Sequence, residues 1–228
     1  MSARSWLASR RQRPRRRVPR QLCAGVLRIN VDPFFSRLVL AAHLGTFMDQ
    51  YPEVSLELIT REHVGDLVAD GFDLALRFGE PSPSSLIARK LLDTRILTVA
   101  APSYLARHGR PNRPADLAIP CMHSVPQPRD GQPFEWEFHR DRKVVPVKTA
   151  GRLLLTDVGT MLGACTTGAG VAQVMALGVQ DLLDHGRLIE LFPDWPGETF
   201  PLYALHPSRH HPPAKVQAFV DFTLQAIH

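Results

Sequence analysis

The sequence has few cysteines and no long apolar run, and both shortages limit what the chain can be. Three cysteines occur in 228 residues, at Cys23, Cys121 and Cys165, and they are far apart. An odd, dispersed set disfavours a disulfide framework and lacks metal-knuckle spacing, so we expect a protein of the reducing cytoplasm. No apolar stretch approaches the length of a membrane span, so we expect no membrane partner.

Acidic residues are missing from residues 1–24, which contain eight arginines. The formal net charge of +5 comes from this segment, because the other 19 of the 27 Lys and Arg are set against all 22 Asp and Glu. We expect residues 1–24 to form a disordered, Arg-rich tail without an export signal, since no apolar run follows Arg10 and Arg11. The tail is either an arm that binds nucleic acid non-specifically or an incidental leader, and we favour the leader.

The sequence also lacks motifs that carry catalysis. We find no nucleophile elbow, no metalloprotease pair, no phosphate loop and no cysteine with a base at a suitable spacing. Cys165 lies on an apolar helix face and is interpreted as a buried small residue. His206, His210 and His211 lie near prolines without an acid or thiol at ligand spacing, which indicates a solvated loop. We therefore expect no enzyme, no catalytic residue, no cofactor and no metal.

Residues 25–79 show the pattern of an α/β unit. Apolar residues alternate over 27–31 and again over 54–58, which predicts two strands. A helix is predicted between them, with one apolar stripe formed by Leu40, Leu44, Phe47, Met48 and Tyr51.

A second helix and a third strand are predicted to complete this unit. The helix covers residues 66–70 and ends at Gly71, and the strand covers residues 72–78. Such a βαβαβ unit needs right-handed crossovers, and its ligands bind where strand ends meet helix starts. The loops at 32–36 and 79–81 are the first candidates for a binding surface.

The second half of the chain alternates in the same way. Strands are predicted over residues 95–100, 136–138, 144–147, 152–156, 171–174, 187–191 and 200–206. Helices are predicted over residues 103–108, 158–165, 179–184 and 213–227. Asp157 directly precedes the second of these helices and is suited to cap it.

Short motifs in a fixed order join these elements. They include Leu27-Arg28-Ile29, Tyr51-Pro52-Glu53-Val54, Gly71-Phe72-Asp73-Leu74-Ala75-Leu76-Arg77-Phe78-Gly79, Ala101-Pro102-Ser103-Tyr104-Leu105, Gly168-Ala169-Gly170-Val171-Ala172 and Val216-Gln217-Ala218-Phe219. In this order and spacing the sequence, from about Gly25 to its end, resembles the effector-binding (substrate-binding) domain of LysR-type transcriptional regulators. Members of that family carry a winged helix-turn-helix and a linker helix before this domain, and we expect this chain to lack them because it leaves no room for them.

The resemblance implies an α/β fold of two Rossmann-like lobes joined by two crossover strands, like that of type 2 periplasmic binding proteins. Lobe I is expected to contain residues 25–99 and 202–228, and lobe II residues 100–201. The crossings are expected near 99–101 and 201–204. A cleft with such a hinge can close on a small ligand.

The resemblance places an effector between the lobes. The expected effector-binding residues are Asp32, Pro33, Phe34, Phe78, Gly79, Glu80, Ala100, Thr156, Asp157 and Val158. Phe34 or Phe35 can line the cleft, with at least one of them expected in the core. Asp157 can orient an anionic or polar ligand or can simply cap its helix, and both readings stay open.

Two charged residues need a partner. Asp32 would repel a carboxylate effector unless Arg37 or Arg77 neutralises it. For Arg77 itself we expect a structural ion pair, with Asp73 or Glu57.

The first functional hypothesis is therefore the ligand-sensing domain of a LysR-type transcriptional regulator, which binds a small-molecule effector and controls transcription. It implies a homo-oligomer, a dimer through antiparallel pairing of lobes and a tetramer in full-length members, with DNA bound through the missing helix-turn-helix domain or non-specifically through the Arg-rich tail. The alternatives are a free-standing small-molecule binding protein of the periplasmic type and a fragment that forms mixed oligomers with intact paralogues.

Overall fold

The computed structural model describes residues 23–61, 64–117, 122–124, 136–140, 143–147, 153–155, 157–195, 198–207 and 212–227. The tail predicted at 1–24 falls outside these ranges except for its last two residues. Cys121, Thr156, His210 and His211 also lie outside them, so the predictions made for these residues stay predictions.

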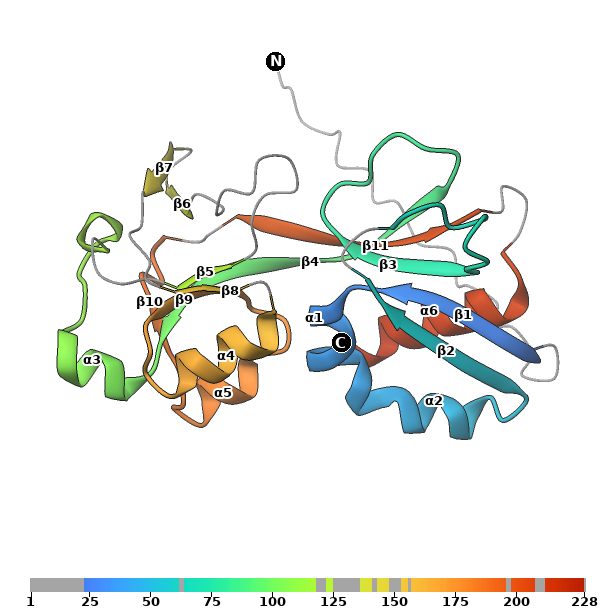
Figure 1. Cartoon of the computed structure of the whole chain (residues 1–228), viewed down its shortest axis with the longest axis horizontal. Helices are drawn as coiled ribbons and strands as arrows, with labels where there is room; N and C mark the ends of the chain where they lie inside the picture. The colour runs from blue at the N-terminus through green and yellow to red at the C-terminus, as the bar shows by residue number, and fades with distance from the viewer. Residues whose placement is uncertain are drawn as a thin grey trace, which may run out of the picture.

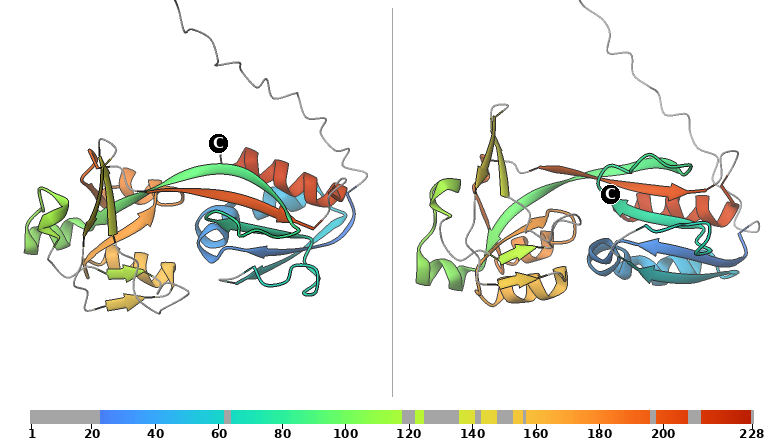
Figure 2. Two further views of the ribbon diagram at one scale, coloured as in Figure 1. Left: turned by 90° about the horizontal axis from the view of Figure 1, so that it is seen from above. Right: turned by 45° about the horizontal axis from the view of Figure 1, so that its top comes forward.

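Two lobes lie side by side and are joined by two long strands, β4 (Ile87–Ala100) and β11 (Thr199–His206) (Figure 1). Within the described residues one sheet runs through both lobes in the order β10-β4-β11-β3-β1-β2, and β9 also pairs with β4. Seen from above, β4 and β11 run next to each other between the lobes (Figure 2). The lobes are therefore connected by a shared pair of strands.

Lobe I is built on three parallel strands. In sheet order they are β3 (Leu74–Phe78), β1 (Gly25–Val31) and β2 (Val54–Thr60). The helical segment between β1 and β2 consists of α1 (Pro33–Phe35), a π-helical turn η2 (Ser36–Leu40), a 3-10 turn η3 (Ala41–His43) and α2 (Leu44–Gln50). The C-terminal helix α6 (Ala214–Ala226) packs on the same core as α2.

The helix predicted after the first strand is confirmed, but its buried stripe is narrower than predicted. Phe47 is fully buried, and its ring lies 5.0 Å from that of Phe219 and 5.1 Å from that of Phe222. Met48 is 51% exposed. Successive residues of an α-helix are turned by about 100°, so Met48 points away when Phe47 faces the core directly.

The second predicted helix, over residues 66–70, is wrong. The chain makes turns there, and the Asp66 side chain accepts hydrogen bonds from the N–H groups of Val68 (3.1 Å) and Ala69 (3.0 Å). Such local side-chain bonds give the backbone an alternative to helix propagation. Gly71 still ends this segment, with a positive φ of +71°.

Lobe II consists of short elements around the C-terminal half of β4. The strands are β5 (Met122–Ser124) paired with β8 (Leu153–Leu155), β6 (Trp136–Arg140) paired with β7 (Lys143–Val147), and β9 (Val171–Met175) and β10 (Ile189–Leu191) on either side of β4. The helices are α3 (Pro102–His108), a 3-10 turn η4 (Pro114–Asp116), α4 (Val158–Thr166) and α5 (Gln180–Asp184). Apart from β5 and η4, which were not predicted, these elements agree with the predicted ones to within a few residues.

The crossing on β4 lies earlier than the predicted 99–101. Arg95 pairs with Thr199 of β11, whereas Ile96 already pairs with Met175 of β9. The apolar run at the end of β4 marks the part buried in lobe II, because residues 97–100 are all buried while earlier residues alternate. The lobe boundaries predicted from the sequence remain a proposal.

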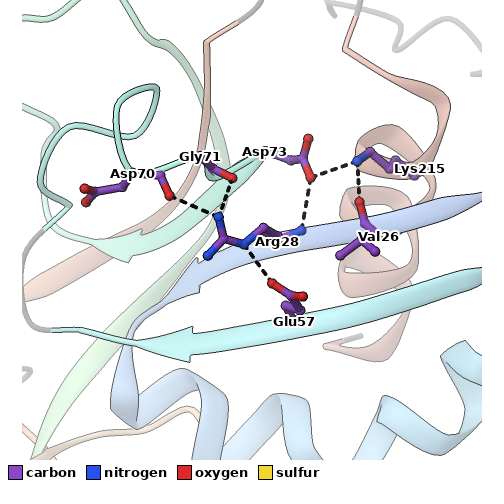
Figure 3. Close-up of polar contacts among 7 residues, drawn as sticks. All are labelled: Val26, Arg28, Glu57, Asp70, Gly71, Asp73 and Lys215. Atoms are coloured by element: carbon purple, nitrogen blue, oxygen red, sulfur yellow. Dashed lines mark hydrogen bonds and ion pairs between the residues drawn. The ribbon is translucent and has the colours of Figure 1, made fainter.

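A charged network ties the strands of lobe I to α6 (Figure 3). The Asp73 carboxylate accepts hydrogen bonds from the Arg28 N–H (3.0 Å) and from Lys215 Nζ (2.8 Å), and Lys215 also donates to the carbonyl of Val26 (2.5 Å). Arg28 Nε in turn donates to Glu57 (2.7 Å). The strands β1 and β2, the helix α6 and the turn before β3 are thereby fixed to one another.

Candidate functional site

Two helical segments begin at the boundary between the lobes, one from each lobe (Figure 1). Asp32 precedes α1, and its side chain accepts a hydrogen bond from the N–H of Phe35 at 3.1 Å. Asp157 precedes α4, and its side chain accepts hydrogen bonds from the N–H (2.6 Å) and the hydroxyl (2.7 Å) of Thr160. Both acids that were expected to face an effector therefore act as helix caps.

The capping contacts keep Asp157 ionised. Its pKa is lowered, first by the hydrogen bond from the Thr160 hydroxyl, then by backbone N–H groups at the start of α4, and to a smaller degree by the positive charge of Arg37. The predicted role of Asp157 as an N-cap is confirmed. Its role in orienting a ligand remains a prediction.

Arg37, from lobe I, lies directly against the first turn of α4 in lobe II. Its guanidinium occupies the space in which a side chain at Gly159 would begin. We considered Arg37 only as a partner for Asp32, and the structure instead places its charge beside Asp157. No local sequence pattern points to this contact.

A second contact between the lobes involves Leu38 and the loop before α5. A Cβ built on Gly178 would lie 2.8 Å from the Cβ of Leu38, so a side chain there would not fit. Leu38 packs against the core of each lobe. Leu177, from lobe II, packs against the core of lobe I, and its N–H donates to the hydroxyl of Thr94 on β4 at 3.1 Å.

The aromatic residues at the boundary belong to lobe I. Phe34 is 4% exposed and Phe35 is fully buried, and both rings make edge contacts with Phe78, with ring centroids 6.1 and 6.2 Å apart. Phe35 is part of the main core of lobe I, as expected for at least one of the pair. Phe78 is only half-buried and ends β3, so it is the ring of this group with surface available for a ligand.

Gly79 and Glu80 start the loop after β3 and are fixed to the crossing strand β11. The N–H of Gly79 donates to the carbonyl of Pro201 at 2.9 Å. The hydroxyl of Tyr203 donates to the Glu80 carboxylate, at 2.9 Å to the nearer oxygen. This contact raises the pKa of Tyr203, because the hydrogen bond to the Glu80 carboxylate favours the protonated hydroxyl.

Ala100 lies apart from the other expected site residues. It is fully buried in a core of lobe II and pairs with Ile189 and Val171. The neighbouring carbonyl of Val99 contacts the thiol of Cys165, near the C-terminal end of α4, at 3.7 Å. Because a helix rises about 1.5 Å per residue, that end of α4 is roughly 10 Å from its first turn. The structure therefore brings Asp157 and Val158 to the boundary but not Ala100.

The ion pair predicted for Arg77 with Asp73 or Glu57 is wrong. Arg77 is 7% exposed and donates to the side-chain oxygen of Asn30 and to the carbonyl of Arg61. Asp73 and Glu57 bind Lys215 and Arg28 instead (Figure 3). Residues 77 and 30 lie on adjacent strands and point to the same side of the sheet. Their hydrogen bonds fix the position of the chain that follows β2.

Cys165 and His206 are both buried. Burial raises the pKa of the Cys165 thiol to about 12, so it is not a reactive thiolate. His206 is the last residue of β11 and is 8% exposed, which makes the predicted solvated loop wrong for this histidine. Within the described residues no three His, Cys, Asp or Glu are arranged to hold a metal, and no described helix is long and apolar enough to cross a membrane.

Comparisons of the sequence with known proteins all match one family. A model of the LysR substrate binding domain matches residues 20–227. The HTH-type transcriptional regulator PtxR of Pseudomonas aeruginosa is 34% identical over 198 residues, which cover 87% of this chain and 63% of PtxR. The HTH-type transcriptional activator AaeR of Escherichia coli is 32% identical over 201 residues, which cover 86% of this chain and 63% of AaeR. The chain thus spans about 63% of the length of these two relatives.

Solved structures agree with this result. CrgA, a LysR-type transcriptional regulator from Neisseria meningitidis, is similar with a TM-score of 0.81 and 26% identity, over 91% of this chain and 70% of CrgA. The isolated regulatory domain of CrgA is covered completely, with a TM-score of 0.80 and 27% identity over 90% of this chain. The predicted class of fold, with two lobes joined by crossing strands, is confirmed.

Proposed function

The chain belongs to the LysR substrate-binding domain family, and from this premise we propose that it is the ligand-sensing domain of a LysR-type transcriptional regulator. In this role it binds a small metabolite between its lobes and so controls transcription. The single observation that carries the proposal is the match of residues 20–227 to this family. The relatives favour this function over a free-standing binding protein, because those described above are transcriptional regulators.

The proposed site lies at the boundary where α1 and α4 begin. It comprises residues from lobe I, lobe II and the loop after β3, namely Asp32, Pro33, Phe34, Phe78, Gly79, Glu80, Thr156, Asp157 and Val158. Asp32 and Asp157 hold acceptor oxygens at the two helix starts. Two carboxylates with a half-buried ring nearby suit a ligand with hydrogen-bond donors and an apolar part, whereas a free carboxylate on the ligand would need a cation such as Arg37 beside it.

Partners follow from the same premise. We infer that the protein acts in the cytoplasm as a homo-oligomer in which lobe I of one copy pairs with lobe II of another. DNA binding is assigned to a helix-turn-helix domain like those that name the relatives. We assign no catalysis and no cofactor to the chain. Light scattering after size-exclusion chromatography tests the oligomer, since a monomer at micromolar concentration contradicts it.

A thermal-shift screen of metabolites tests the proposed function. A ligand that binds only the folded state raises the unfolding temperature, by an amount that grows with ligand concentration. Asp157→Asn is a sharp probe of the site, because asparagine caps a helix about as well as aspartate and only the charge is lost. We expect a ligand that stabilises the wild-type chain and stabilises Asp157→Asn and Asp32→Asn clearly less. Ligands that stabilise all three equally would place the site elsewhere and overturn the proposal.

A further inference from the structure

One turn of lobe I, residues 37–39, fits against two glycines of lobe II. Gly159 lies in the first turn of α4, where any side chain would overlap the Arg37 guanidinium. Gly178 lies before α5, and a Cβ there would be 2.8 Å from the Cβ of Leu38 and 3.4 Å from both its carbonyl oxygen and a methyl of Val39. Real Cβ atoms essentially never approach other atoms closer than 3.0 Å. The absence of a side chain at Gly178 therefore lets the lobes meet there, and the absence of one at Gly159 leaves room for the Arg37 guanidinium.

The same turn is linked to the crossing strand β4. Leu38 packs against the cores of both lobes, and Leu177, next to Gly178, packs against the core of lobe I. Leu177 is also hydrogen-bonded to Thr94 of β4, one residue before the strand changes partners. A change in the angle between the lobes would have to disturb this set of contacts.

The charges at the start of α4 are compatible with the position of Arg37. A cation at a helix N-terminus is normally unfavourable, because the helix dipole is positive there. Asp157 compensates, since its carboxylate is ionised and near enough for Arg37 to contribute to its lowered pKa, behind the larger effect of Thr160. Arg37 thus lies at the start of α4 in the space over Gly159, with the charge of Asp157 near enough to offset the repulsion from the helix dipole.

We propose that Arg37 and Leu38 form a latch between the lobes, with Gly159 and Gly178 as its sockets. The latch holds the lobes in the arrangement described above. An effector acts by breaking these contacts or by tightening them as the lobes close. Packed contacts of this kind switch between discrete arrangements instead of deforming gradually. The regulatory part of this inference rests on the proposed function, but the contact itself is measurable without a ligand.

Two alanine substitutions in one helix give a matched test. Gly159→Ala adds a methyl group where the Arg37 guanidinium lies, and the guanidinium is the end of a flexible side chain that can move away. Gly163→Ala adds the same group four residues later, where nothing lies within 4 Å. Alanine is a better helix former than glycine, so neither change weakens α4 by itself. Any difference between them reports the contact with Arg37.

Electron spin resonance distances between the lobes provide the measurement. Nitroxide labels are placed on Asp49→Cys in α2 and Ala106→Cys in α3, both exposed positions, in a chain with Cys121→Ser. We expect Arg37→Ala and Gly159→Ala each to raise the population of longer distances roughly threefold, as befits the loss of one contact of an exposed side chain. Gly163→Ala keeps the wild-type distribution. The double variant Arg37→Ala/Gly159→Ala shows no more change than either single variant, because both remove one contact.

Two results overturn the latch. One is a wild-type distance distribution for Arg37→Ala and Gly159→Ala in samples that retain a cooperative unfolding transition. The other is an additive effect in the double variant, which would show that residues 37 and 159 act independently. Neither result bears on whether a metabolite binds, so a failed latch leaves the proposed function standing. A failed ligand screen likewise leaves these distances interpretable.

Discussion

Thr94 and Leu177 are 83 positions apart and meet in a hydrogen bond of 3.1 Å, from the Leu177 N–H to the Thr94 hydroxyl. Thr94 lies on the strand that crosses between the lobes and is 5% exposed. Lobe II is thereby attached to the crossing strand itself, at the point where the strand leaves lobe I.

Replacing Thr94 by valine tests this attachment. Valine has nearly the same shape but leaves the Leu177 N–H without its acceptor, and a buried unsatisfied group costs about 1–3 kcal/mol. We expect the free energy of unfolding in urea to fall by about that amount. Thr199→Val is the control, because Thr199 is exposed on the neighbouring strand and should change stability by less than about 0.5 kcal/mol. Equal effects of the two variants would contradict the expectation.

Asp157 should contribute to stability through capping, and part of this contribution should depend on its ionisation. Asp157→Ala removes the bonds to Thr160, and we expect a loss of about 1 kcal/mol at pH 7, whereas Asp157→Asn should cost much less. The pKa of Asp157 is lower in the folded state than in the unfolded chain. The ionic part of its stabilisation is therefore complete above the unfolded pKa of about 3.9. It is lost as the pH falls from there through the folded pKa. Urea unfolding of the wild type and Asp157→Ala between pH 7 and pH 3 measures this, and a pH-independent difference would refute it.

His206 should make the folded chain sensitive to mild acid. Burial lowers its pKa, and its Nδ1 has no hydrogen-bond partner among the described residues. The unfolded chain therefore takes up a proton first, so stability is full above pH of about 6.5 and decreases as the pH falls toward the folded pKa. His206→Phe fills the site without a titratable group and should flatten this part of the stability curve. His108→Gln, at an exposed position, serves as the control and should leave the curve unchanged.

The ion pair between Lys215 and Asp73 should anchor α6. The two side chains are 20% and 26% exposed, and Lys215→Met removes the charge while keeping most of the apolar stem. We expect a loss of about 1 kcal/mol and faster hydrogen exchange at the start of α6. Lys90→Met breaks an ion pair with Asp93 whose side chains are 46% and 47% exposed, and such solvent-screened pairs contribute little or nothing to stability. A larger effect at Lys90 than at Lys215 would contradict this prediction.

Local patterns in the sequence predicted the elements well where one physical signal was strong. The N-cap at Asp157 and the helix after it follow from a capping residue before an apolar stripe. The failed helix at residues 66–70 shows the limit, because Asp66 is compatible with both a helix start and a closed turn. The choice depended on the packing of that segment over the sheet, which no local pattern records.

The candidate site was harder to predict for a geometrical reason. The contact of Arg37 with Gly159 joins residues from different lobes, so neither neighbourhood in the sequence indicates it. The resemblance placed Ala100 at the site, beside a crossing expected near residues 99–101, yet β4 continues past the observed crossing and carries Ala100 into the core of lobe II. Periodicity predicts which residues are buried along one element, but not where a long strand exchanges partners.

The pairing of Arg95 with Thr199 has a consequence for engineering. The described elements of lobe II from α3 to β10 all lie between these two positions in the sequence, and the two positions are direct neighbours in the sheet. Insertions with adjacent ends are tolerated well by a host fold. We therefore expect residues 96–198 to be exchangeable as one segment with the corresponding residues of another member of the family, which would combine the lobe I of one member with the lobe II of another.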